Sequence, residues 1–352
     1  MSLSLDEVSH RTAWDDQGKH DQIVPVQELS LHEGRLYWPG ADDDGFGFAL
    51  TPYAMGQACQ KLGMPAAYFA RCPKSLQDAQ FNHWRSVERK ERQKAGGDGE
   101  ERWTLRAKNS TIRGVLSAKY EKLDNHQLLE ALVPALSGSD YQVKLFNISD
   151  ESFHLRLIDP RMSRLAFPGD PLLVAIHVAN SEIGLRAVTI DACVYRQVCS
   201  NGLVRRVAGK SILKQRHIHV ATEGLIPSLQ EAVQQAKLVA AAFMEQMILS
   251  AKTLVPDPER AIQILASSWG LTKQTVEYIR FGLHGESRPD TVYGLLNAVT
   301  NAAQRLSPDG RFELETLASV LIDTNDDSRA GASLRHAVLA PKSAAPFELA
   351  LS

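Results

Sequence analysis

Four or five β-rich segments follow one another between residues 141 and 222, and this run constrains the fold more than any other feature. The segments read YQVKLFNIS, SFHLRLIDP, PLLVAIHVANS, LRAVTIDACVYRQVCS and GLVRRVAGKSILKQRHIHV. No segment between them is long enough for the helical crossover that parallel strands require. Consecutive strands of this kind are therefore expected to pair as a mainly antiparallel sheet.

Helical patterns lie on both sides of this run. The stretch KLDNHQLLEALVPAL has Asp124 or Asn125 as its cap and repeats leucine at helical spacing. From Leu225 onward the pattern is helical, and one helix there begins at the cap Asp257 and ends on Gly270. The chain is thus expected to be an α+β protein, a mainly antiparallel sheet with flanking helices and a C-terminal helical region.

The expected divisions follow these patterns. Residues 1–100 form an N-terminal segment with a helical corner and a charged loop, and 101–222 form the antiparallel sheet region with one helix. Residues 223–323 form the helical region, and the Ala-, Ser- and Pro-rich residues 324–352 are expected to be a mobile tail.

The helical corner lies in LTPYAMGQACQKLGMPAAYFARCP. Thr51 can cap a helix whose first residue is Pro52, and Gly63 ends that helix before a second, short one opens at Pro65. Two short helices about a glycine suggest either a helix-turn-helix or a compact corner within a core. The second helix is too short for a convincing recognition helix, which favours the corner.

Composition excludes several classes of protein. The net charge is −2, so an attraction to nucleic acid has to come from uneven charge placement. Four cysteines in 352 residues do not make a disulfide framework. No apolar run approaches the ~20 residues needed to cross a membrane, and the N-terminus lacks the apolar core of a signal peptide. We expect a cytoplasmic protein with no membrane association and no cofactor.

The stretch VCSNGLVRR poses the main functional question. Asn201-Gly202 between two β-rich runs predicts a hairpin with a two-residue type I′ loop. In that register Arg196 and Arg205 would be diagonal neighbours on one face. Cys199 as a nucleophile would need a positioned base and an oxyanion pocket, and no spacing brings His217 or His219 to it.

Two intervals without acidic residues, from Arg102 through Tyr120 and from Ala192 through Thr222, suggest a local positive surface. Cations neutralise phosphates, and aromatic faces stack on unpaired bases. The alternative is that these charges form the solvated face of a half-buried sheet and pair with acids elsewhere. The candidate nucleic-acid-binding residues are Arg102, Arg106, Lys108, Arg113, Lys119, Arg196, Arg205, Arg206, Lys210, Lys214 and Arg216.

Motifs for other chemistry are absent. GADDDGFG lacks the ligand pattern of an EF-hand, and there is no phosphate-cradling loop, HExxH or GxSxG. Carboxylates near strand ends show no spacing that pairs them for catalysis: Glu151, Asp159, Asp170 and Asp191. We therefore assign no catalytic and no metal-binding residues.

Four stretches, in order along the chain, resemble one family: LTPYAMGQACQKLGMPAAYFARCP, IRGVLSAKYEKLDNHQLLEAL, VANSEIGLRAVTIDACVYRQVCSNGL and TVYGLLNAVTNAAQRL. It is the phage/plasmid-like protein family, domain of unknown function 932. The resemblance covers about residues 45–322, and CSNGL and LNAVT are its more specific pieces. ERKERQKAGGDGEE looks like an insertion. The resemblance implies carriage on phages, plasmids and integrated elements, and it supplies no catalytic residues.

These observations predict a DNA-binding protein of mobile elements that prefers single strands and acts as a homo-oligomer in recombination, replication or repair, without catalysis of its own. In outline this is similar to the single-strand annealing proteins of phages, although no motif of theirs is matched. Two alternatives stay open. One is a metal-dependent nuclease or other enzyme, and the other is a protein-interaction module that counters host defence.

Overall fold

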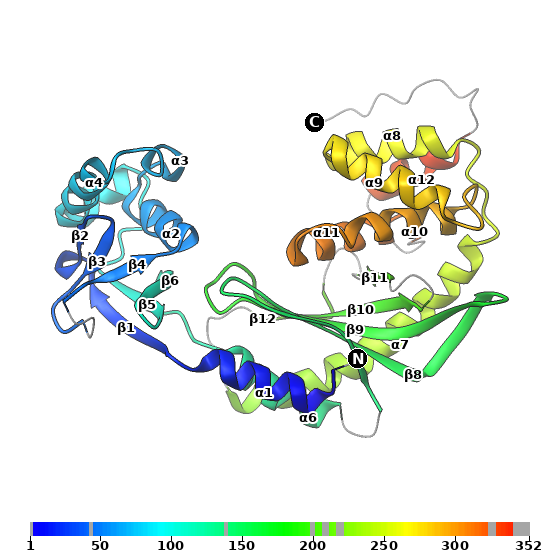
Figure 1. Ribbon diagram of the computed structural model, residues 1–352, viewed down its shortest axis with the longest axis horizontal. Coiled ribbons are helices and arrows are strands. Elements are labelled where there is room, and N and C mark those ends of the chain that lie inside the picture. Colours follow the sequence, from blue (N-terminus) through cyan, green and yellow to red (C-terminus); the bar gives the residue numbers. More distant parts are fainter. Residues whose placement is uncertain are drawn as a thin grey trace.

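The structure, a computed structural model, describes residues 3–41, 45–136, 140–197, 201–205, 211–215, 222–322 and 329–340. Side chains are not described at 201–205, 215, 222–225 and 329–333. The described residues form an α+β protein with two largely antiparallel sheets, as expected from the sequence. Figure 1 shows an N-terminal lobe at the left and, apart from it, a group of C-terminal helices above the second sheet.

The first sheet belongs to the N-terminal lobe, residues 19–117. Its order is β1-β5-β6-β4-β3-β2, antiparallel except for the parallel pair β4 and β6. The strands are β1 (Lys19–Pro25), β2 (Ser30–His32), β3 (Arg35–Tyr37), β4 (Phe48–Leu50), β5 (Arg102–Lys108) and β6 (Thr111–Ser117). The sequence division at residue 101 therefore cuts through one sheet, because β5 pairs along its length with β1 at the start of the chain.

A layer of four helices lies between β4 and β5 in the chain, and the first three pack on this sheet together with the 3-10 turn η1 (Val26–Glu28). The helices are α2 (Pro52–Leu62), α3 (Ala66–Phe69), α4 (Lys74–Ser86) and α5 (Arg89–Lys94). The expected ends of α2 are confirmed, since Thr51 accepts a hydrogen bond from the Ala54 amide and Gly63 has φ +76°. In α3 only four residues are helical and Phe69 is completely buried, so the corner interpretation is confirmed over a recognition helix.

The second sheet contains the run of strands that dominates the sequence. Its order is β11-β10-β9-β8-β7, all neighbours are antiparallel, and β12 also pairs with β10. The strands are β7 (Gln142–Ile148), β8 (Phe153–Phe167), β9 (Asp170–Asn180), β10 (Val188–Arg196), β11 (Asn201–Arg205) and β12 (Leu213–Gln215).

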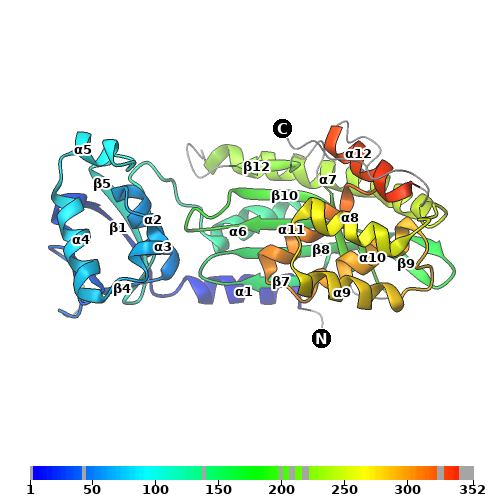
Figure 2. The same ribbon diagram turned by 90° about the horizontal axis from the view of Figure 1, so that it is seen from above.

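Three helices lie along one face of the second sheet, as Figures 1 and 2 show together. They are α1 (Leu5–Asp16), α6 (Asn125–Ala135) and α7 (Thr222–Ser250). The expected cap of α6 is confirmed, because Asp124 and Gln127 form a capping box. Leu128, Leu129, Leu132 and Leu136 are all buried, as the helical spacing predicts.

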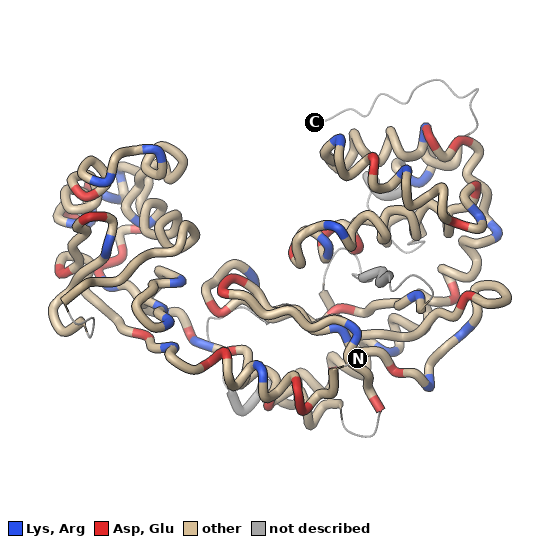
Figure 3. The backbone as a smooth tube through the Cα atoms, in the orientation of Figure 1, with Lys and Arg blue, Asp and Glu red and all other residues tan. Residues whose placement is uncertain are grey.

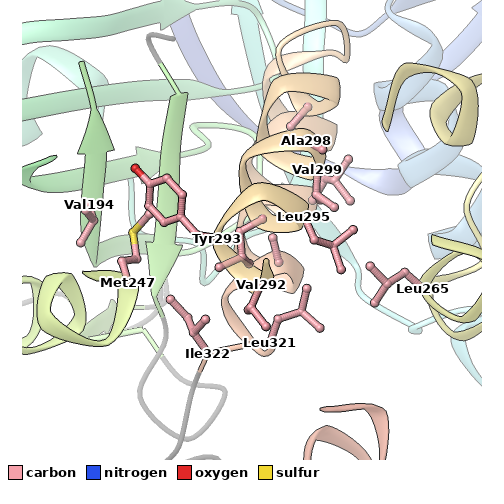
Figure 4. Packing of buried hydrophobic residues seen from close by; sticks show 14 of the residues in the cluster. Val194, Met247, Leu265, Val292, Tyr293, Leu295, Ala298, Val299, Leu321 and Ile322 are labelled. Atoms are coloured by element: carbon pink, nitrogen blue, oxygen red, sulfur yellow. The ribbon is translucent and has the colours of Figure 1, made fainter. Parts of the chain in front are cut away.

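The C-terminal helices are α8 (Pro258–Trp269), α9 (Lys273–His284), α10 (Val292–Ala303), α11 (Pro308–Ser319) and α12 (Arg329–Leu339). Figure 4 shows the packing around α10, where Val292, Leu295 and Val299 face residues from several elements. The expectation of a mobile tail from residue 324 is wrong for 329–339. This segment forms α12, because Leu334 and Val338 join the same core.

α11 covers the sheet face opposite to α7. Leu157 and Ile176 pack with α7, whereas the alternate positions Ile158 and Ala175 pack with Phe312 of α11. Because successive side chains of a strand point to opposite faces, the sheet lies between two helical layers. Among the described residues, no helix is both long and apolar enough to span a membrane.

Candidate functional site

The β10–β11 hairpin differs from the expected one. Arg196 pairs with Asn201 and Tyr195 with Gly202, so residues 197–200 connect the strands and the predicted two-residue loop is wrong. An ion pair with Asp170 of β9 fixes the side chain of Arg196. β10 therefore stays paired in the sheet as far as Arg196. In the observed register Arg205 lies opposite Ala192 and is no diagonal neighbour of Arg196. Cys199 lies outside the described residues.

The structure separates the candidate nucleic-acid-binding residues into four groups. Arg206, Lys210 and Arg216 lie outside the described residues, and of Arg205 only the backbone is described. Arg102, Lys119 and Lys214 are exposed. Lys108 is partly exposed, and its Nζ lies 2.6 Å from Asp15 Oδ1. Arg106, Arg113 and Arg196 are buried and ion-paired.

The prediction that Arg106 and Arg113 contact DNA is wrong, because both are buried where the N-terminal lobe joins the second sheet. Glu182, in the β9–β10 connection, accepts hydrogen bonds from Arg113 Nη1 and Nη2, each 3.1 Å away. Lys19 Nζ lies 2.9 Å from the other Glu182 oxygen. Arg106 donates to the Glu182 carbonyl and pairs with Asp21 and Asp124.

This set, the junction cluster, consists of Lys19, Asp21, Arg106, Arg113, Asp124 and Glu182. Burial by itself would raise the pKa of Glu182, but the charges of Lys19 and Arg113 outweigh burial and the pKa lies below its ordinary value. The carboxylate is therefore ionised at neutral pH, and it links the first sheet to the second.

Two members of the junction cluster, with the neighbouring Asp16, bear on the metal alternative. Asp16, Asp124 and Glu182 are the one group of carboxylates in the described chain close enough to share an ion, within 4.8 Å. Lys19 Nζ lies 2.9 Å from Glu182 and 3.6 Å from Asp16, and Arg106 pairs with Asp124. Since the protein's own cations neutralise this group, it does not favour a nuclease centre.

Arg196 is likewise not available to DNA. It donates to both carboxylate oxygens of Asp170 and to both of Glu286, and its guanidinium lies 5.3 Å from the Tyr293 ring centroid. The Tyr293 hydroxyl donates to Asp170 Oδ2 at 2.8 Å. Arg196 therefore joins the second sheet to α10.

A second buried polar network, which the sequence analysis missed, lies beneath α11. Asp191, His177 and Arg156 are neighbours on β10, β9 and β8, and each is at most 1% exposed. Arg156 donates to both carboxylate oxygens of Glu315 on α11. Phe312, also on α11, stacks on the His177 ring with 4.6 Å between the centroids. We call Arg156, His154, His177, Asp309 and Glu315 the α11 network.

The hydrogen bonds of the α11 network fix the protonation of both histidines. Arg156 can only donate, so His177 Nδ1, 3.4 Å from its Nη2, is an acceptor. His177 then donates from Nε2 to His154 Nδ1 at 3.1 Å, and His154 donates from Nε2 to Asp309 Oδ1 at 3.1 Å. Each ring carries one proton and is neutral.

Electrostatics agree with this assignment. Burial lowers the pKa of His177 well below its usual value, and the positive charge of Arg156 lowers it further. Burial also lowers the pKa of His154, although the hydrogen bond to Asp309 opposes the shift. Because both rings are closed off from solvent, the α11 network attaches α11 to the sheet and offers no substrate an approach.

The sequence did contain a signal for the α11 network. His154 and Arg156 occupy alternate positions of one apolar strand, and His177 stands alone in another. Polar residues on the buried face of a strand require partners. Glu315, in an expected helix, is the partner of Arg156, and Arg311, four residues earlier, lies 3.0 Å from Glu315 Oε1 through its Nε.

We predict that folding stability falls as the pH is lowered from 6.5 to 5. The two histidines have lowered pKa values when folded but about 6.5 when unfolded, so below pH 6.5 the unfolded chain binds more protons. Each histidine then removes up to about 1.4 kcal/mol of stability per pH unit. Urea unfolding at a series of pH values measures this slope.

His177→Gln should flatten that slope, whereas His284→Gln, at an exposed histidine, should leave it unchanged. Equal stability of the unaltered protein at pH 6.5 and pH 5 would contradict the prediction.

Exposed lysines and arginines are concentrated on the helices of the N-terminal lobe, outside the two intervals without acidic residues. Residues 52–95, which span α2 to α5, contain eight lysines and arginines and three acidic residues, although the net charge of the chain is −2. Figure 3 shows Lys and Arg along these helices. Five of the cations are exposed and form no ion pair with any described residue: Arg71, Lys74, Arg89, Lys90 and Lys94. We call these five the basic helical surface.

A family model described as a domain of unknown function (DUF932) matches residues 113–338. The match begins later than the resemblance seen in the sequence and extends past residue 324 into α12. No curated protein and no solved structure matches the chain.

Proposed function

The chain belongs to the family described as a domain of unknown function (DUF932), a membership that assigns no reaction, and we propose that this member is a DNA-binding protein without catalysis of its own. The observation that carries the proposal is the basic helical surface. Lysines and arginines that lack carboxylate partners are the groups that phosphates recruit, with release of counterions. The buried arginines of the two sheets have no part in this proposal.

The spacing of these cations suits a polynucleotide strand. Arg71 and Lys74 lie at the start of α4, and Arg89 and Lys90 follow its end. α4 has 13 residues and is therefore about 20 Å long, a distance that several nucleotides span. The acidic Asp78 between these ends is engaged, since it accepts hydrogen bonds from the amides of Glu33 and Gly34.

We propose a preference for single strands. Tyr68 is 49% exposed three residues before Arg71, so an aromatic face stands beside the cations. Aromatic faces stack on unpaired bases, which a duplex does not present. The exposed candidates from the sequence, Arg102, Lys119 and Lys214, stay predicted as further phosphate contacts. The same holds for Lys108, Arg205, Arg206, Lys210 and Arg216.

The setting that we propose is recombination, replication or repair of mobile elements in the cytoplasm, with self-association of the chain. Among the described residues, no carboxylate cluster free of cations favours the alternative of a metal-dependent nuclease. The carboxylates close enough to share an ion, Asp16, Asp124 and Glu182, pair with Lys19 and Arg106 and so do not support the nuclease alternative.

We expect R89A/K90A/K94A to weaken binding of a labelled single-stranded oligonucleotide. Removal of three cations should reduce the slope of log affinity against log salt by about 2, because each phosphate contact of a single strand contributes about 0.7. Fluorescence anisotropy at rising salt measures both the affinity and the slope, and a duplex of the same sequence tests the strand preference.

Two comparisons give this experiment its controls. Lys273→Ala removes an exposed lysine of α9 and should change neither quantity. R102A/K119A/K214A removes the same number of charges as the test variant, and a loss there would extend the DNA path to the sequence candidates. Absent binding, or binding that ignores salt, would end the proposal.

A further inference from the structure

The outer face of α7 carries an exposed apolar stripe. Leu238 is 71% exposed and Leu249 61%, and Ala242, also exposed, lies between them at helical spacing. The opposite face of α7, with Val233 and Phe243, is buried in the core. The stripe therefore takes no part in the packing of α7 against the described parts of its own chain.

More apolar surface adjoins this stripe. Leu254, shortly after α7, is 65% exposed. Arg164 Nη1 lies 3.1 Å from Glu245 Oε1, which brings the β8–β9 hairpin and its 58% exposed Leu165 next to α7. Four of the fourteen large hydrophobic residues exposed in the described chain therefore lie on this part of α7 or beside it: Leu165, Leu238, Leu249 and Leu254. Apolar residues gathered in this way mark a contact surface, whereas scattered ones do not.

The order of residues along the stripe fits a second copy of the same chain. A two-fold axis between Phe243 and Met244 would place Leu238 against Leu249 of the other copy and the reverse, because the two positions are equally far from that point. Ala242 lies near the axis, where a small side chain lets two helices approach closely. A two-fold contact must be self-complementary in this sense.

Charge is complementary in the same arrangement. Glu231, toward the start of α7, and Lys252, just after its end, are both exposed. When two α7 helices run antiparallel, each Glu231 comes within one helical turn of Lys252 in the other copy. Glu245 would lie opposite the small Ala242 of the other copy, and Arg164 of its own chain already pairs with it.

We propose that the protein forms a homodimer in which two α7 helices pack antiparallel through this stripe. The dimer gives the self-association within the proposed function a defined surface. Its test uses no DNA, so that dimerisation and DNA binding can fail independently.

Sedimentation velocity of the full chain over a range of concentrations tests the dimer. The unaltered protein should shift from monomer to dimer as concentration rises, and L238K/L249K should weaken association by about tenfold or more, because it buries charge at the centre of the contact. The matched control is L76K/L185K, at two leucines that are each 40% exposed elsewhere. It should dimerise as the unaltered chain does. A chain that is monomeric at every concentration overturns the proposal.

Exchanging the charges of Glu231 and Lys252 tests the antiparallel geometry. Because the double variant should recover association, a loss in the single variants cannot be attributed to misfolding. Glu231→Lys and Lys252→Glu should each weaken association several-fold, because each sets like charges together at two places in the dimer. The double variant E231K/K252E should restore it. A double variant that is as weak as the sum of the single variants shows that another surface or another partner meets the stripe, and it overturns the antiparallel dimer.

Discussion

Glu182→Leu is expected to lower the free energy of unfolding by about 3–5 kcal/mol, because it leaves the buried Arg113 without a carboxylate and removes one of the carboxylates that pair with Lys19. The side chains of Lys19 and Arg113 are 5% and 2% exposed, and both lie within 3.1 Å of Glu182. The isosteric Glu182→Gln keeps hydrogen-bonding capacity but removes the charge, and its loss should be intermediate. Urea unfolding at pH 7, followed by circular dichroism, measures the change.

A control separates this effect from the loss of an ordinary ion pair. Asp98 pairs with Lys61 at 2.7 Å, and its side chain is 35% exposed. Asp98→Asn should cost at most about 1 kcal/mol, since solvent screens such a pair. If Glu182→Leu were no more destabilising than Asp98→Asn, the junction cluster would not hold the N-terminal lobe to the second sheet.

Arg156→Met is the second large effect that we expect, with a loss of about 3–5 kcal/mol. The change removes one of the two cations that pair with Glu315, whose side chain is completely buried, and leaves only Arg311. It also removes the donor to His177 Nδ1. The same unfolding measurement applies, and fluorescence of an extrinsic apolar dye would report whether α11 has left the sheet.

The matching double variant tests the physical reason. R156M/E315L replaces the buried pair by apolar side chains, so it should be less destabilised than Arg156→Met alone, because no charge stays buried without a partner. Arg280→Met, in the exposed pair of α9 with Glu259, should change the unfolding midpoint little. Additive losses in R156M and E315L would contradict the role given to the pair.

The parts of the fold that could be predicted are those that depend on near neighbours in sequence. Caps at Thr51, Asp124 and Asp257 satisfy amides three residues away, so a short window contains the whole interaction. The antiparallel second sheet was also predictable, because its strands pair in chain order. The pairing of β1 with β5 was not, because it joins segments separated by the entire helical layer.

The prediction of the candidate site was wrong for the same reason, because it too depended on contacts between residues far apart in sequence. Arg106 and Arg113 lie on strands in an interval without acids, which is why they were interpreted as free cations. Their carboxylate partners, Asp21 and Glu182, lie 85 and 69 positions away along the chain. Whether a charged residue on a strand meets solvent or a distant carboxylate depends on tertiary packing, and periodicity does not report it. The helical layer was overlooked because its cations alternate with acids in ERKERQK.

The position of β6 within the first sheet has a practical consequence for work with shortened chains. The residues that match the family begin at Arg113, inside β6, which lies between β5 and β4. A fragment cut there would start part-way along a strand whose two flanking strands had been removed. Its bare backbone edges would offer a template for pairing between molecules. Fragments that retain everything from β1 onward keep those edges covered and should resist aggregation better.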